Sequence, residues 1–163
     1  MFNDIKIISN NNFKDKRGLL WTTWKKGVFK NIKFNHDKFS LSKKKTLRGF
    51  HCDFKSWKMV TSVYGKFLFV VVDMRKNSKN YLKNQKWIID YKKPKLILIP
   101  PYYANAHLCL SEICIFHYKW SYKGKYIDAT DQKSYRWNDP KINIKWPIKK
   151  PILSKRDLTA KNI

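Results

Sequence analysis

Short runs of β-branched and aromatic residues recur along the 163-residue chain, and glycine, proline and other turn formers separate them. Such residues favour β-strands because they pack well on a pleated, half-buried surface. No segment long enough for a helix shows a clean apolar period of 3.6 residues. The pattern predicts an all-β protein, an antiparallel sandwich or barrel, with strands at Ile5–Ser9, Gly18–Trp24, Thr46–Asp53, Lys58–Tyr64, Lys66–Asp73, Lys86–Ile89, Lys95–Ile99 and Glu112–Trp120.

Two of these strands carry more detailed predictions. The segment Lys66–Asp73 is apolar on both faces, which indicates a central strand covered on both sides. In Glu112–Trp120 the side chains alternate, and Tyr118 shares an aromatic face with Phe116 and Trp120. We expect that face to point inward. On this pattern alone, a core tyrosine explains Tyr118 as well as a functional one does.

Arg48 and His51 are three positions apart within one predicted strand, so a regular strand would point them to opposite faces. Gly49 lies between them and permits a β-bulge, which would turn both side chains into one cavity. On this pattern alone, a single histidine on a strand is more often structural than catalytic.

The end of the chain predicts a different kind of structure. The segment after Asn138 contains Pro140, Pro147 and Pro151, so we expect irregular chain that wraps the surface and forms at most a short helix. The length, together with the absence of a linker-like stretch, predicts a single domain over residues 1–163.

The composition is that of a folded domain. Hydrophobic residues make up 43% and aromatic residues 16%, which excludes a disordered chain. The longest apolar run, Phe67–Val72, is too short for a membrane helix. The first residues lack the apolar core of a signal peptide. We therefore expect a cytoplasmic protein without a membrane partner.

The formal net charge of +25 is the unusual feature of the composition, and it favours attraction of polyanions. Arginine, whose planar fork reads phosphates and bases, occurs only at positions 17, 48, 75, 136 and 156. The remaining basic residues are lysines. A solvated, lysine-rich surface explains the charge better than nucleic-acid binding does, and a non-enzymatic polyanion-binding protein remains the alternative.

Few residues are candidates for chemistry. The four histidines show no HxH or HExxH spacing, and no GxGxxG, P-loop or GxSxG motif occurs. Metal, dinucleotide and serine-hydrolase sites are therefore poorly supported. Cys52, Cys109 and Cys114 form no CxxC pair and are expected to be reduced and buried, although Cys52 follows a histidine and is a possible nucleophile. The remaining titratable candidates are Arg48, His51, Lys58, Tyr118 and Asp157.

A series of short motifs, in order over roughly residues 13–160, resembles the dTDP-4-dehydrorhamnose 3,5-epimerase family. The string Leu47-Arg48-Gly49-Phe50-His51 resembles the family's L-R-G-L-H. Each motif is weak alone, but the ordered set is specific. The others are Lys14-Asp15-Lys16-Arg17-Gly18, Ser40-Leu41-Ser42, Lys58-Met59-Val60, Val71-Val72-Asp73-Met74-Arg75, Ile99-Pro100-Pro101, Leu110-Ser111-Glu112, Tyr118-Lys119, Trp137-Asn138-Asp139-Pro140, Ile144-Lys145-Trp146-Pro147 and Leu153-Ser154-Lys155-Arg156-Asp157.

The resemblance implies a cupin-type jelly roll with short peripheral segments, which forms a homodimer and uses no metal or other cofactor. The implied substrate is a nucleotide-linked 4-keto-6-deoxy sugar, whose C3, C5 or both are inverted through an enolate. By resemblance, His51 is the base and Asp157 orients it. Tyr118 is the acid on the opposite face, and Lys58 stabilises the enolate.

The positions that would bind the substrate depart from the family pattern. The resemblance implies that Arg48 holds the diphosphate and that Arg17 reaches it from a partner subunit. The departures favour an altered substrate, and they resemble the GDP-6-deoxy-4-keto-heptose branch, which serves capsule or lipopolysaccharide synthesis. A 3,4-ketoisomerase of the same fold is the alternative reaction. The departing residues are His36 and Lys38 for Q-x-N, Thr22 for a glutamate, Asn105 within Ala104-Asn105-Ala106-His107 for the histidine of A-H-G-F, and Lys123-Gly124 for an aromatic pair.

Overall fold

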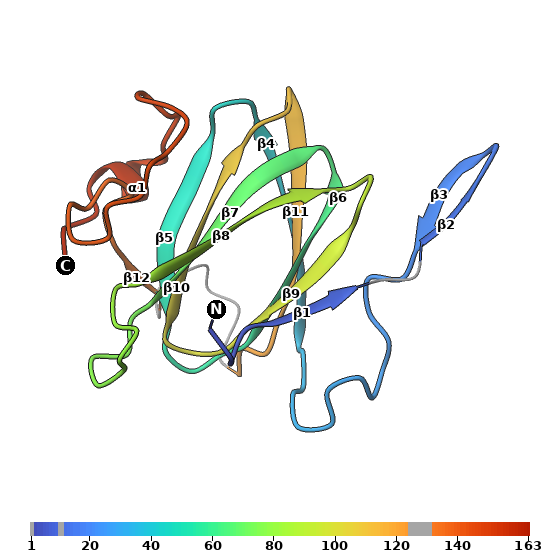
Figure 1. Ribbon diagram of the computed structural model, residues 1–163, viewed down its shortest axis with the longest axis horizontal. Helices are drawn as coiled ribbons and strands as arrows, with labels where there is room; N and C mark the ends of the chain where they lie inside the picture. The colour runs from blue at the N-terminus through green and yellow to red at the C-terminus, as the bar shows by residue number, and fades with distance from the viewer. Residues whose placement is uncertain (1, 10–11, 124–131) are drawn as a thin grey trace.

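The computed structural model describes residues 2–9, 12–123 and 132–163, and these are almost entirely β-strands and their connections (Figure 1). The strands are β1 (Lys6–Ser9), β2 (Asn12–Asp15), β3 (Gly18–Trp21), β4 (His36–Lys43), β5 (Leu47–Asp53), β6 (Lys58–Tyr64), β7 (Lys66–Asp73), β8 (Asn84–Asp90), β9 (Lys95–Ile99), β10 (Tyr103–Cys109), β11 (Ile113–Trp120) and β12 (Lys133–Ser134), and the short helix is α1 (Lys155–Leu158). The first sheet has the order β1-β9-β6-β11-β4, and the second has the order β12-β5-β10-β7-β8. β2 and β3 form a separate hairpin.

The two sheets are antiparallel and curve over one another, which confirms the predicted jelly-roll sandwich (Figure 1). β7 confirms the prediction of a central strand covered on both sides. Its Phe67, Phe69 and Val71 belong to the core between the sheets, and the alternate residues Leu68 and Val70 belong to a second core on the outer face. Burial of these two clusters stabilises the fold through the hydrophobic effect.

The C-terminal segment covers the outer face of the second sheet. Trp146 packs against Phe50 of β5, with ring centroids 5.9 Å apart, and its indole nitrogen donates to the backbone oxygen of Trp137. Further along, the backbone of Ile152 exchanges hydrogen bonds with Leu47 and Lys45 at the start of β5. The predicted irregular tail with a short helix is confirmed, and it fixes α1 beside the middle of β5.

Two long strands were not predicted, β4 and β10. β4 alternates polar inward residues with exposed ones, and β10 carries alanines and an asparagine, so neither has the residues typical of strands. Both strands form because neighbouring strands in the sheets hydrogen-bond to them and bury them, which offsets their low intrinsic strand propensity. The predicted strand Gly18–Trp24 was too long, because the hairpin ends at Trp21.

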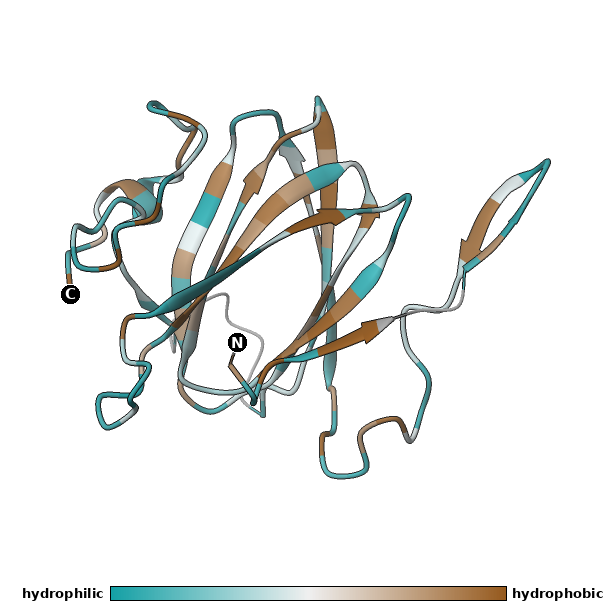
Figure 2. Ribbon diagram, in the orientation of Figure 1, coloured by the Kyte–Doolittle hydropathy of each residue, from teal (hydrophilic) through white to brown (hydrophobic). Residues whose placement is uncertain are grey.

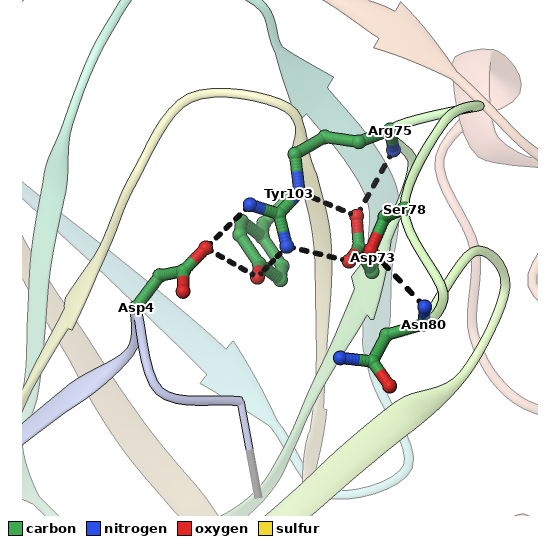
Figure 3. Close-up of polar contacts among 6 residues, drawn as sticks. All are labelled: Asp4, Asp73, Arg75, Ser78, Asn80 and Tyr103. Carbon is green, nitrogen blue, oxygen red and sulfur yellow. Dashed lines mark hydrogen bonds and ion pairs between the residues drawn. The ribbon is translucent and has the colours of Figure 1, made fainter.

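The N-terminal strand pairs within its own chain, where β1 lies antiparallel to β9. A polar cluster holds the segment before β1 against the second sheet (Figure 3). In it, Arg75 contacts both Asp4 and Asp73, and Tyr103 donates to Asp4 at 3.2 Å. The Val71–Arg75 motif therefore has a structural role, and β1 finds its partner strand, β9, within its own chain.

The outer face of the first sheet is only partly covered. The loop over residues 22–35 places Phe29, Ile32 and Phe34 on its β6–β9 side. On its β4–β11 side, Phe39 and Leu41 are more than half exposed. The β2–β3 hairpin projects from the body of the molecule and contains hydrophobic residues (Figure 2). Of these, Phe13 and Leu20 are exposed.

None of the helices in the described part of the chain is long and apolar enough to cross a membrane.

Candidate active site

A cavity of about 520 Å³ lies between the two sheets. This volume falls in the range of small-molecule sites. The first sheet supplies one wall, and β5 and β10 of the second sheet supply the facing wall, with the C-terminal segment at its edge. The lining residues are Lys38, Phe39, Ser40, Arg48, His51, Lys58, Asn105, His107, Phe116, Tyr118, Gln132, Ser154, Arg156 and Asp157.

A bulge in β5 brings Arg48 and His51 into the same cavity, as the sequence predicted. Asn105 of β10 lies opposite His51, and His107 lies opposite Arg48, so three steps along β5 match two along β10. Gly49 makes this possible. Its φ is +115°, and a Cβ at this position would lie 2.5 Å from the backbone oxygen of Asn105, so only glycine fits.

His51 forms a pair with a carboxylate that is distant in sequence. Its Nε2 lies 2.7 Å from Oδ1 of Asp157. Ser154 caps α1 by accepting from the backbone nitrogen of Asp157, and its hydroxyl donates to Oδ2 of the same carboxylate at 3.0 Å. The amide of Asn105 donates to the backbone oxygen of His51. Both members of the pair are thus held in place by neighbouring groups.

The electrostatics of the pair favour a neutral imidazole beside a carboxylate. Burial lowers the pKa of His51 below its usual value and outweighs the raising effect of Asp157. Burial alone would raise the pKa of Asp157, but its hydrogen bond and charge interaction with His51, together with the hydrogen bond from Ser154, hold that pKa below the ordinary value. An imidazole in this state can accept a proton, and Asp157 stabilises the imidazolium that forms.

Lys58 is the buried cation of the cavity, with only 6% of the residue exposed. Burial lowers its pKa to about 8, and the negative charge of Asp53 opposes this effect. Asp53 is itself held by the indole nitrogen of Trp120 at 2.8 Å. A lysine with such a pKa is still largely protonated at pH 7, so it can stabilise a negative charge that develops on a ligand.

Tyr118 lies on the wall opposite His51, because β11 belongs to the first sheet and β5 to the second. The alternation of β11 confirms the prediction that Phe116, Tyr118 and Trp120 share the inward face. The ammonium group of Lys38 lies 5.9 Å from the centroid of the Tyr118 ring. The cavity therefore has a base on one wall and a phenol on the other.

Two guanidinium groups also line the cavity. Arg48 donates from Nε to the hydroxyl of Ser42 at 3.0 Å. Arg156 donates to the hydroxyl of Ser134 at 2.6 Å and to the backbone oxygen of Gln132. These hydrogen bonds hold two planar, permanently charged guanidinium groups at the cavity, where they are suited to bind an anionic part of a ligand.

Three of the predicted substrate-binding residues do not line this cavity. Arg17 pairs with Asp15 in the exposed turn of the β2–β3 hairpin, and Thr22 follows that hairpin. His36 packs against the ring of Trp120, with centroids 5.5 Å apart. Within one chain the structure brings Lys38, Arg48 and Asn105 together but not these three, and Gly124 lies outside the described residues.

Sequence reasoning missed His107 and Phe116 as lining residues, and it named Arg156 only within a motif. The signal for His107 was its two-residue spacing from Asn105, which places both on one face once β10 is recognised as a strand. Cys52 is not suited to be a nucleophile, because burial raises the pKa of its thiol to about 12. Over the described residues, no group of three or more potential metal ligands comes together.

Together, these groups give the cavity the features of an acid–base enzyme, with a histidine–carboxylate pair facing a phenol and with fixed cations suited to an anionic ligand. Comparison with known proteins specifies the class. The sequence matches the dTDP-4-dehydrorhamnose 3,5-epimerase family over residues 1–163. The chain therefore belongs to this family, and it is an isomerase-class enzyme that acts on nucleotide sugars as a 3,5-epimerase.

Relatives and solved structures agree with this assignment. The chain is 30% identical to the dTDP-4-dehydrorhamnose 3,5-epimerase of Salmonella typhimurium over 96% of its own length and 89% of that protein. Its fold matches the Legionella pneumophila dTDP-6-deoxy-D-glucose-3,5-epimerase in complex with dTDP-4-keto-L-rhamnose, with a TM-score of 0.90, 27% identity and coverage of 99% and 88%. The Bacillus anthracis enzyme with TDP and PPi bound gives a TM-score of 0.90 at 27% identity, with coverage of 99% and 95%.

Proposed function

We propose that this enzyme inverts C3, C5 or both of a nucleotide-linked 4-keto-6-deoxy sugar through an enolate. One observation carries the proposal: the His51–Asp157 pair and Tyr118 face one cavity from different sheets. Inversion at a carbon needs a base on one face of the sugar ring and a proton donor on the other, and this arrangement supplies both.

Each residue then has a defined part in the chemistry. Hydrogens on C3 and C5 are acidic because both carbons are next to the C4 ketone. His51 removes one of them, and Asp157 orients the imidazole and stabilises its positive charge. Lys58 stabilises the enolate oxygen, since a buried cation is effective where negative charge develops. Tyr118 returns a proton to the opposite face.

For the substrate, we assign the diphosphate to Arg48, with Arg156 as a second cation. The Legionella pneumophila enzyme binds dTDP-4-keto-L-rhamnose, and the Bacillus anthracis enzyme binds TDP and PPi. In this chain, Lys38 and Asn105 line the cavity at positions where the sequence departs from the family motifs. These departures support a different sugar or base, and we propose the GDP-linked 6-deoxy-4-keto-heptose of capsule or lipopolysaccharide synthesis.

The test is isotope exchange in deuterated water. The enzyme is incubated with GDP- and dTDP-linked 4-keto hexoses and heptoses, and NMR reports which carbons gain deuterium and which are inverted. We expect exchange and inversion at C3, C5 or both. Interconversion of the ketone between C3 and C4 would instead identify a 3,4-ketoisomerase. Absence of any exchange, with binding of nucleic acid, would support the polyanion-binding alternative, which the cavity around His51 already disfavours.

We further propose a homodimer in which the β2–β3 hairpin contacts the partner subunit and Arg17 reaches that subunit's cavity. Support comes from the exposed apolar residues Phe13 and Leu20 on the hairpin and Leu41 on the open face of the first sheet. Patches of this kind mark interfaces in soluble proteins.

The dimer predicts a change of mass in solution. Leu41→Asp should shift the protein toward the monomer, because it places a charge in an apolar contact, whereas Ile88→Asp, at an exposed apolar position of β8, should not. Light scattering after size exclusion measures both. A wild-type monomer with full activity would contradict the proposal.

The pKa shifts predict a bell-shaped pH profile for kcat/KM. The acidic limb should lie below the usual histidine value near 6.5, because His51 must be neutral and burial lowers its pKa. The alkaline limb should fall near pH 8, where Lys58 loses its proton. Lys58→Arg keeps the charge and should move the alkaline limb upward. An unchanged alkaline limb in that variant would assign it to another group.

A further inference from the structure

Two buried polar groups at the Arg48 end of the cavity have no hydrogen-bond partner among the described residues. They are the Nε2 of His107 on β10 and the hydroxyl of Ser40 on β4. Both residues line the cavity, and His107 is only 5% exposed. Buried polar groups in native proteins are almost always hydrogen-bonded, so an unpaired one on a ligand cavity indicates a partner that the ligand supplies.

Both groups adjoin Phe116. Ser40 is the cross-strand partner of Phe116 in the β4–β11 ladder. The His107 ring stacks on Phe116, with centroids 4.1 Å apart and an interplanar angle of 5°. His107 lies opposite Arg48 in the β5–β10 ladder, and Arg48 donates to Ser42, the next residue on the inward face after Ser40. The groups therefore lie near Arg48. They also lie near Phe116, which precedes Tyr118 on the inward face of β11.

The chemistry of this corner fits a hydroxyl better than an anion. Burial, with the nearby charge of Arg48, lowers the pKa of His107 to about 3, so its imidazole is neutral and offers one donor and one acceptor. Ser40 offers the same pair of functions in its hydroxyl.

We propose that His107 and Ser40 form a subsite that hydrogen-bonds one sugar hydroxyl and determines which sugars react. This inference rests on the proposed function. Diphosphate at Arg48 fixes C1 at that end, and the reactive carbons lie near His51 and Tyr118. The hydroxyl is then that of C2 or one carried by the substituent on C5, because both positions lie between C1 and the C4 ketone.

The test compares substrates that differ by one hydroxyl. kcat/KM is measured for the 4-keto sugar nucleotide, its 2-deoxy analogue, and a pair that differs only in a hydroxyl on the C5 substituent. We expect the wild type to prefer the hydroxylated member of one pair by about 10-fold to 100-fold. His107→Phe and Ser40→Ala should each reduce that preference to a few-fold, with little change for the deoxy substrate. The A-H-G-F motif has phenylalanine at position 107, so His107→Phe is compatible with the stack on Phe116.

The subsite proposal can be contradicted in two ways. Equal loss on both members of each pair, or an unchanged preference in both variants, would overturn the subsite. The pair that shows the preference identifies the hydroxyl. Thermal unfolding checks that each variant folds, and the two substitutions lie on different sheets, so one can fail without the other. Calorimetry with unreactive 4-hydroxy sugar nucleotides separates the two proposals: a hydroxyl preference in binding without epimerisation would support the subsite and refute the reaction.

Discussion

His51→Asn should abolish most exchange and most inversion together. Asparagine keeps roughly the shape of the side chain but cannot act as the base, and a general base contributes on the order of 10²–10⁴-fold. We expect deuterium incorporation from solvent and inversion of the sugar carbon both to fall by about that factor. NMR on one sample measures both quantities, and their ratio should stay near that of the wild type.

Asp157→Asn provides the matched variant. It removes the charge that stabilises the imidazolium but leaves an amide that can still contact Nε2 of His51. Exchange and inversion should fall together, by less than in His51→Asn, and the acidic limb of the pH profile should move to lower pH because the raising effect on the pKa of His51 is lost. Near-normal rates in the folded fraction of both variants would instead identify the pair as structural.

Strands rich in apolar residues could be predicted from the sequence. Strands that depend on pairing with their neighbours in the sheet could not. β7 is apolar on both faces, so its place between two cores follows from its sequence. β4 exposes every second residue and lines the cavity with polar ones, so its strand character comes from pairing with β11. β10 follows Pro100-Pro101 and contains small residues, so its position between β5 and β7 decides its conformation.

Some features of the candidate site could likewise be predicted from the sequence, and others could not. The bulge at Gly49 was predictable because two polar side chains three positions apart need an irregularity to share a cavity. The contact between His51 and Asp157 spans 106 positions, and only the ordered motifs pointed to it. His107 was missed because β10 was not recognised as a strand. The contribution of Arg17 needs a second subunit, which no pattern within one chain specifies.

Few of the basic residues behind the net charge of +25 belong to the candidate site. Of the cations that line the cavity, Arg48 and Arg156 are held by hydrogen bonds to serine hydroxyls, and Lys58 is buried. Most other basic residues lie on exposed strand faces and loops, where solvent screens them. Their collective field can still attract a substrate with a diphosphate group, an effect that would weaken as the ionic strength rises.

Tyr118→Phe should separate exchange from inversion, which distinguishes an acid from a core tyrosine. The substitution removes one hydroxyl and keeps the ring that packs near Phe116. His51 should still remove the proton, and a proton can return from the side that it left. Deuterium should therefore still enter the substrate at one carbon at least, while inversion falls by on the order of 10²–10⁴-fold. NMR measures deuterium content and configuration at each carbon.

Phe116→Leu is the control for packing, since it alters the same inward face of β11 without touching a proton donor. It should lower stability or affinity and leave the ratio of inversion to exchange unchanged. If Tyr118 were only a core residue, Tyr118→Phe would behave like this control. Equal loss of exchange and inversion in folded Tyr118→Phe would show that the tyrosine acts before or during deprotonation, and the assignment of the two walls to base and acid would then be wrong.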